Sequence, residues 1–174
     1  MSYVRFYSGL SFKLSTYNNA KYWDGTLQYS YDGSTWNTWD GTTVLNSADS
    51  IYNSIYLRGI NNTYCGNSYS NPTFCFTEFS VPIDSEGNIE SLLDYATVDN
   101  NQHPIMAYQA FIGLFMDQIA LRTAPELGAI TLSDQCYRYM FAGCTALTVA
   151  PELPALELAS NCYGAMFYEC TGLT

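Results

Sequence analysis

Positive charge is scarce in this chain. Its 174 residues include six lysines and arginines against sixteen aspartates and glutamates, so the formal net charge is −10. The six cations are scattered, at Arg5, Lys13, Lys21, Arg58, Arg122 and Arg138. A nucleic-acid backbone requires a clustered basic surface. The composition therefore argues against nucleic-acid binding, and it also disfavours docking to an anionic membrane surface.

Long apolar runs are also missing. No stretch approaches the roughly 20 apolar residues of a membrane-spanning helix, so we expect no membrane insertion. The first ten residues, MSYVRFYSGL, lack the apolar run of a secretory signal. We therefore expect either that a signal was removed or that the protein leaves its cell without secretion, as a phage virion protein does at lysis.

Residues suited to catalysis or metal binding are few. His103 is the single histidine, and it precedes Pro104 in a polar segment where we expect it to be solvated. A thiol nucleophile needs a neighbouring base, and none of the six cysteines forms the C-x-x-C pair that is typical of zinc sites. Phosphate loops and dinucleotide fingerprints do not occur. The sequence predicts a protein that is not an enzyme, with no cofactor and no metal.

The chain is rich in apolar and aromatic residues instead. Hydrophobic residues make up 48% and charged residues 13%, with sixteen tyrosines and nine phenylalanines. Disordered chains have the opposite balance. A neutral, polar and aromatic surface is typical of secreted or virion β-proteins, and the length allows one domain or two small ones.

The C-terminal half contains a 26-residue repeat. The segment Ala-Pro-Glu-Leu at 124–127 recurs at 150–153. Further pairs share this offset: Cys136-Tyr137 with Cys162-Tyr163, Met140-Phe141 with Met166-Phe167, Cys144-Thr145 with Cys170-Thr171, and Leu147-Thr148 with Leu173-Thr174. A degenerate earlier copy is visible at Phe111, Phe115 and Leu121. A fixed period of this length predicts stacked coils, each packing on its neighbours.

Each repeat unit divides into two parts. The segment 147–149 alternates apolar and polar residues before Pro151, which predicts a short strand and a turn. Cys162, Met166 and Cys170 lie four residues apart, so they would line one face of a short helix that begins near Ser160 or Asn161. We therefore predict one strand and one helix per coil.

The repeat also predicts a role for four cysteines. Equivalent positions in adjacent coils should lie roughly 5 Å apart, the spacing of neighbouring strands. Cys136 would then lie over Cys162 and Cys144 over Cys170, as buried ladders of small side chains. A disulfide between such positions is sterically possible, although we favour reduced cysteines. The other ladder residues are Met140, Met166, Phe141, Phe167, Leu147 and Leu173.

The full repeat pattern, Ala-Pro-Glu-Leu followed by Cys-Tyr-x-x-Met-Phe-x-x-Cys-Thr-x-Leu-Thr, resembles the BspA-like leucine-rich repeats of bacterial surface proteins. Similar units occur in structural proteins of phages that infect gut bacteria. The resemblance covers about 105–174, and 87–95 looks like the segment that introduces such arrays. It implies adhesion or virion structure, with no catalytic residues. The unit at Thr174 is partial, so we expect truncation, a capping partner or packing on another subunit.

The N-terminal part is predicted to be β-rich. Asp-Gly pairs at 24–25, 32–33 and 40–41 favour two-residue hairpin turns. They lack the ligand pattern of a calcium loop, so calcium is disfavoured. The turns predict a four-stranded meander at 18–23, 26–31, 34–39 and 42–47. Further strands are expected at 3–7, 10–15, 55–59 and 73–81.

The predicted turns fix which side chains share a face. The core face would hold Tyr22, Leu27, Tyr29, Trp36 and Leu45. The opposite, polar face would hold Trp23 and Trp39, which is unexpected for two large aromatic residues. They are candidates for a glycan-stacking platform or a subunit contact, or alternatively a loop at 61–72 covers them.

Taken together, the sequence predicts a mainly β protein with two parts. Residues 1–86 form an antiparallel β-sandwich or meander, and 87–174 form a short leucine-rich-repeat solenoid with a junction segment at 87–110. The expected function is structural and adhesive: a phage virion fibre of tail or head, or an appendage protein for host attachment. The alternative is a secreted or surface-anchored BspA-like bacterial adhesin. Expected partners are further copies in a homotrimer, other virion proteins, or a host-surface glycan or protein receptor.

Overall fold

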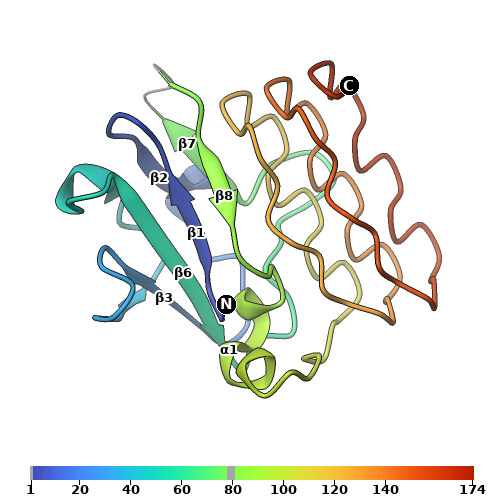
Figure 1. Cartoon of the computed structure of the whole chain (residues 1–174). Helices are drawn as coiled ribbons and strands as arrows, with labels where there is room; N and C mark the ends of the chain where they lie inside the picture. Colours follow the sequence, from blue (N-terminus) through green and yellow to red (C-terminus); the bar gives the residue numbers. More distant parts are fainter. Residues whose placement is uncertain (1, 78–80) are drawn as a thin grey trace.

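The computed structural model describes residues 2–77 and 81–174, and the fold is mainly β (Figure 1). The strands are β1 (Val4–Tyr7), β2 (Lys13–Thr16), β3 (Thr26–Ser30), β4 (Asn37–Trp39), β5 (Leu45–Asn46), β6 (Ser54–Ile60), β7 (Phe74–Thr77) and β8 (Asp84–Glu86). The helical elements are the 3₁₀ turns η1 (Tyr17–Asn19) and η2 (Ser47–Asp49) and the α-helix α1 (Ser91–Asp99). Across the described residues, no helix is both long and apolar enough to cross a membrane.

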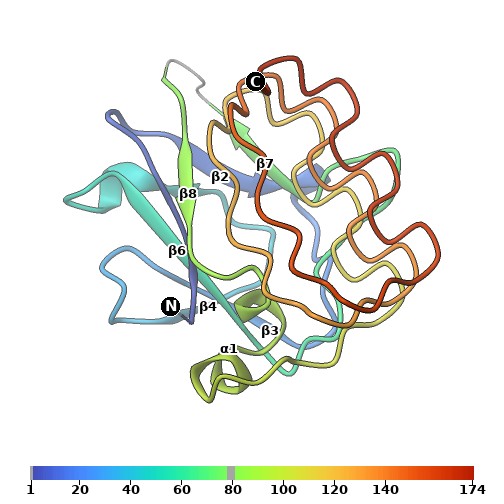
Figure 2. The same cartoon turned by 45° about the vertical axis from the view of Figure 1, so that its right-hand side comes forward.

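The strands form two antiparallel sheets. One has the order β4-β3-β6-β1-β8 and the other the order β5-β2-β7. Phe6 of β1 connects them, because its ring centroid lies 5.1 Å from that of Phe76 and 6.4 Å from that of Phe74, both in β7. The mainly β prediction for this part of the chain is therefore confirmed, and the two sheets lie side by side in Figures 1 and 2.

Individual strand predictions meet different outcomes. The strands expected at 3–7 and 55–59 are confirmed as β1 and β6. The strand expected at 10–15 begins later, at Lys13. The strand expected at 73–81 is present as β7 up to Thr77, and the rest of that prediction includes 78–80, which lie outside the described residues.

The predicted four-stranded meander is wrong. β3 pairs with β4 and β6, whereas β5 pairs with β2 in the other sheet. The first Asp-Gly pair makes no hairpin, because Asp24 accepts a hydrogen bond from the Thr63 N–H at 2.8 Å and Gly25 donates to Asn62 Oδ1 at 2.6 Å. These long-range partners replace the local turn, and the segment before it contains η1 instead of a strand.

Residues 105–174 wind into three coils that follow β8, drawn from yellow to red in Figures 1 and 2. The predicted strand and helix of each coil are wrong: these residues contain neither a regular strand nor an α-helix. The reason lies in the backbone, since every fourth residue has a positive φ, as at Gln135 (57°), Tyr139 (56°) and Gly143 (75°). A helix does not tolerate this conformation. Successive four-residue turns nevertheless give the same i, i+4 side-chain spacing as a helix.

The coils attach directly to the edge of the larger sheet. Ile83 and Leu121 form one parallel bridge, and Asn88 and Glu126 form another. The Ile89 N–H donates to Glu126 O at 2.9 Å. β8 is therefore paired with β1 on one side and with the first coil on the other, so backbone pairing continues across the expected boundary at 86.

Side-chain packing is continuous across the same boundary. The ring of Phe115, in the first coil, lies 5.8 Å from Phe6 and 5.9 Å from Phe74, and 5.6 Å from Phe141 of the second coil. Phe115 is fully buried, and one hydrophobic cluster contains residues of both sheets and all three coils. The two halves therefore share a single core.

We predict that Phe115→Ala lowers the free energy of unfolding by about 3–5 kcal/mol, because it leaves a cavity where the sheets meet the coils. Urea unfolding followed by circular dichroism and by tryptophan fluorescence should give one coincident transition, since the core is shared. Ile51→Ala is the control, with a side chain that is 87% exposed and an expected change within about 0.5 kcal/mol. Separate transitions for the two probes would contradict a shared core.

Candidate functional site

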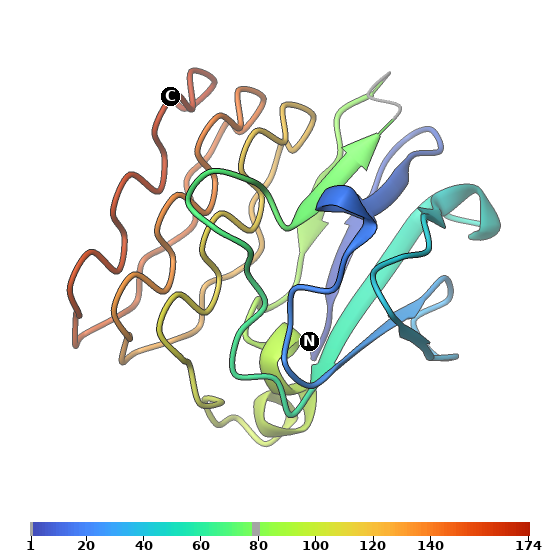
Figure 3. The same ribbon diagram turned by 180° about the vertical axis from the view of Figure 1, so that it is seen from behind.

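The repeat array is the candidate site, and three turn segments form one side of it. These are the first (107–117), second (133–143) and third (159–169) turn segments, and Figure 3 shows them stacked in order away from the sheets. Within a segment, alternate amides bond backward by three residues, as from Arg138 N–H to Gln135 O at 3.1 Å. The remaining amides point to the next segment.

Hydrogen bonds between segments follow one register. Five amides of the second segment donate to carbonyls of the third, each 25 residues further along, at 2.8–3.0 Å. The donors are Gln135, Tyr137, Tyr139, Phe141 and Gly143. Five amides of the first segment donate to the second in the same way at 2.7–3.0 Å. The turn segments are thus joined like strands of a sheet, although each is itself a chain of turns.

Two columns of aromatic rings run through the stack. Phe111, Tyr137 and Tyr163 form one, with centroids 5.6 and 5.8 Å apart and ring planes within 9°. A second column consists of Phe115, Phe141 and Phe167, with spacings of 5.6 and 5.9 Å. These distances slightly exceed the expected strand spacing of roughly 5 Å, which suits offset stacked rings.

The four repeat cysteines lie inside the coils, and all six cysteines of the chain are free thiols. Cys136 and Cys144 are fully buried, and Cys162 and Cys170 are buried in the third segment. The Cys144 thiol donates to Phe115 O, and the Cys170 thiol donates to Phe141 O, both at 3.0 Å. Burial, with Cys162 adding a smaller effect, raises the pKa of the Cys136 thiol to about 12. Burial also raises the pKa of Cys144.

The remaining ladder residues lie in the same interior. Met140, Phe141 and Leu147 are fully buried in the second coil. Their equivalents in the third coil are Met166, which is 2% exposed, and Phe167 and Leu173, which are partly buried against the core. The structure thus places all ten residues of the predicted ladder in or against one hydrophobic cluster.

A groove runs between the two copies of the Ala-Pro-Glu-Leu motif. Its volume is about 430 Å³. It is lined by Ala124, Pro125, Glu126, Leu127, Gly128, Pro151, Glu152 and Pro154. Both glutamates are exposed. The repeat therefore gives the surface a concave strip with prolines on its walls and one exposed carboxylate from each coil.

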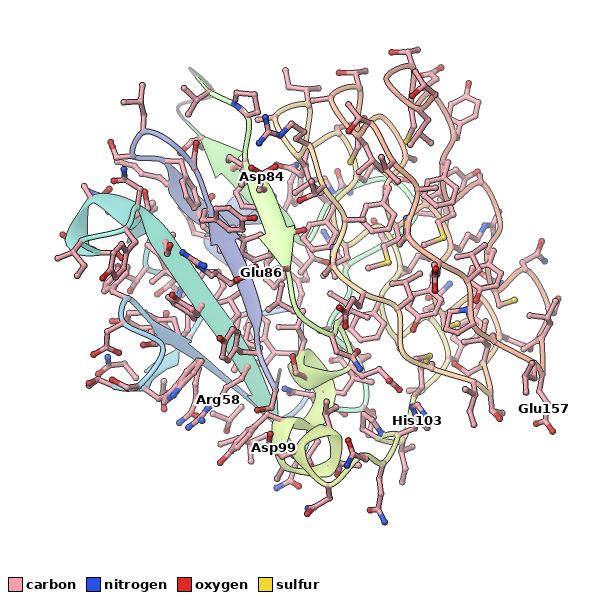
Figure 4. All side chains as sticks on the ribbon, in the orientation of Figure 1. Arg58, Asp84, Glu86, Asp99, His103 and Glu157 are labelled. Atoms are coloured by element: carbon pink, nitrogen blue, oxygen red, sulfur yellow. The ribbon has the colours of Figure 1, made fainter. Side chains whose placement is uncertain are left out.

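Trp23 and Trp39 are not on an exposed polar face, so their prediction as a contact surface is wrong. They are 3% and 1% exposed, and their ring centroids lie 5.6 Å apart. The backbone of Trp23 pairs with Cys65, which lies in the 61–72 segment that was the alternative cover. Trp36, predicted in the core, is half-buried at the surface, where the Arg58 guanidinium lies 4.0 Å from its ring centroid (Figure 4).

A register shift explains this exchange of tryptophans. Tyr29 pairs with Asn37 and not with Trp36, because the turn after β3 is longer than two residues. The Asp32 carboxylate holds this turn by accepting hydrogen bonds from the Thr35 and Ser34 N–H groups at 2.7 and 2.8 Å, which also lowers the pKa of Asp32. A shift of one residue moves every side chain of a strand to the other face.

Two ionic contacts at the junction were not predicted. His103, expected to be solvated, places Nδ1 3.0 Å from Oε2 of Glu90, whose side chain is 1% exposed. Arg122 of the first coil forms a bidentate ion pair with Asp84 of β8. His103 and Asp84 are labelled in Figure 4. Only their separation in sequence hid these pairs, since each joins residues 13 or 38 positions apart.

Comparisons with known proteins add no relative: no family model, no curated protein and no solved structure matches this chain. Among residues 2–77 and 81–174, no group of three or more His, Cys, Asp or Glu side chains is arranged to hold a metal ion. The candidate site is therefore defined by the geometry of the array alone.

We predict that the buried thiols resist alkylation in the folded protein. With a pKa of about 12, Cys136 is a thiolate in a fraction on the order of 10⁻⁴ at pH 8, and the thiolate is the reactive form. Iodoacetamide followed by peptide mass spectrometry should leave Cys136 and Cys144 unmodified and should modify the half-buried Cys75 first. Urea should make all six react alike. Early labelling of Cys136 without urea would contradict the buried placement.

Proposed function

We propose that this protein is a non-enzymatic structural and adhesive protein of a virion, a fibre or appendage component that takes part in host attachment. In this proposal the two β-sheets anchor or oligomerise the chain, and the coil array is displayed. The observation that carries it is the shared register of the coils, which repeats the same surface residues at a fixed spacing. Repeated sites allow several weak contacts to act together on a repetitive host surface.

We also propose a finer description of the fold. The N-terminal sheets form a β-sandwich, and the coils form a divergent solenoid of the BspA-like leucine-rich type. The 26-residue offset, the cross-coil hydrogen bonds and the aromatic columns support the solenoid. The replacement of the helix by turns is the divergent feature.

The placement of reactive groups supports a structural role. The thiols of Cys144 and Cys170 donate to carbonyls of the preceding coil, and their protons are held by raised pKa values. Asp84 and Glu90 are engaged by Arg122 and His103 at the junction. Groups that would serve as nucleophile or acid are thus used to hold the coils on the sheets.

The groove between the Ala-Pro-Glu-Leu motifs supports an adhesive surface. Its two glutamates are the same motif position in successive coils, so a ligand with a repeated hydroxyl or cationic group would meet them in turn. We propose a host-surface glycan or protein as this ligand. A BspA-like adhesin, secreted or anchored on a bacterial surface, would use the same groove and is the alternative assignment.

The virion assignment predicts where the chain is found. Gold-labelled antibodies against the purified protein should decorate phage particles from lysed gut bacteria in electron micrographs, at fibres or appendages. Decoration of the bacterial envelope alone would support the adhesin alternative and overturn the virion assignment. Measurable hydrolysis of glycans by the purified chain would overturn the non-enzymatic proposal.

We further propose that the chain associates into a homotrimer through its N-terminal part. Exposed apolar side chains gather around η2 and the loop after it, where Ile51 is 87% and Tyr52 is 65% exposed. Contiguous apolar surface of this kind often marks an interface.

Light scattering at micromolar concentration should give about three times the mass of one chain, 19.5 kDa. Replacing Ile51 and Tyr52 together with serine should lower that mass, whereas Leu156→Ser on the last coil, where Leu156 is 84% exposed, should leave it unchanged. A monomeric mass for the unaltered protein would count against self-association.

A further inference from the structure

The third turn segment carries a row of backbone donors on its outer side. Its amides at Asn161, Tyr163, Ala165, Phe167 and Glu169 are equivalent to the five amides by which the second segment holds the third. Within residues 2–77 and 81–174, these five amides have no hydrogen-bond acceptor. In Figures 1 and 3 this segment forms the outermost coil, on the side away from the sheets.

The outer side offers donors without matching acceptors. Alternate carbonyls of the third segment accept from the second segment, as Cys162 O does from Tyr137 N–H at 2.9 Å. The intervening carbonyls accept from amides of their own segment, as Tyr163 O does from Met166 N–H at 3.2 Å. A molecule that covers this side must therefore supply acceptors, and unpaired amides are costly to bury without them.

Apolar side chains at equivalent positions show what such a cover would bury. Leu127 in the second coil is 5% exposed, whereas Leu153, 26 residues further on, is 46% exposed. Leu132 is 7% exposed and its equivalent Leu158 is 66% exposed. The same residue type at the same position is thus buried where a coil follows and exposed where none is present in the structure.

The other end of the stack shows why a second copy does not fit. A head-to-tail partner would have to present the acceptor side of its first turn segment, but the N-terminal part already covers that side. Ala110 O accepts from the Cys65 N–H at 2.6 Å, and Leu114 O accepts from the Phe74 N–H at 3.0 Å. A tail-to-tail partner would oppose donors to donors.

We propose that the outer side of the third turn segment binds a further polypeptide coil of the same 26-residue repeat, carried by a segment other than a second copy of this chain. The bound segment presents alternate backbone carbonyls to the five amides. It also places two aromatic rings four residues apart over Tyr163 and Phe167, which extends both ring columns. This inference rests on the hydrogen-bond register and does not depend on the attachment function.

The test is a chain extended by a second copy of residues 149–174, studied by amide hydrogen exchange with residue-level resolution. In the unextended protein, the five outer amides should exchange rapidly while their equivalents from Gln135 to Gly143 are protected. In the extended protein, exchange at the five amides should slow on the order of tenfold or more, because the added coil occupies them. The matched control carries the same 26 residues in shuffled order and should produce no slowing.

Three outcomes would overturn the proposal. The first is equal exchange at the five amides in the extended and shuffled chains. The second is protection in the unextended protein that increases with its concentration, which would assign the surface to a second copy. The third is loss of protection at Tyr137 and Phe141 in the extended chain alone, which would show that an added coil does not fit the stack.

Discussion

The coil array depends on one backbone constraint, the return of a left-handed residue at every fourth position of the turn segments. This conformation prevents a helix and turns alternate amides outward, where they reach the carbonyls of the next coil. Each left-handed residue other than glycine costs on the order of 1 kcal/mol. Five cross-coil hydrogen bonds and two ring contacts per interface offset that cost, so the conformation persists only in the stack.

The same constraint explains how the array is joined to the sheets. Segments around Cys65 and Phe74 of the N-terminal part donate to the first coil as one coil donates to the next. Phe6, Phe74 and Phe115 then continue the ring column into the space between the sheets. The N-terminal part therefore acts as the first layer of the stack in both its backbone and its side chains.

Sequence reasoning succeeded where a signal is periodic. The 26-residue offset led to the buried positions of Cys136, Met140 and Phe141, because equivalent residues must occupy equivalent places in stacked coils. It failed on the local conformation, because an i, i+4 spacing is shared by helices and by four-residue turns. Turn positivity in φ at Tyr139 or Ala165 leaves no mark in the residue types themselves.

The failures in the N-terminal part have a different cause. The Asp-Gly rule assumes that both partners of a turn are local, whereas Asp24 is held by Thr63 and the turn at Asp32 is extended by its own side-chain bonds. That single-residue change in register exchanged Trp36 and Trp39 between surface and core. The contacts of His103 and Arg122 depend on the assembled fold and have no local pattern.

The covered acceptor side of the first coil gives the molecule a direction. A ribosome releases the N-terminal part first, so the surface that receives coil one exists before coil one is made. Each later coil then meets a finished template on its N-terminal side and supplies the template for its successor. Assembly of the array during synthesis is thus vectorial, and an error in one coil is passed on only to the coils that are translated after it.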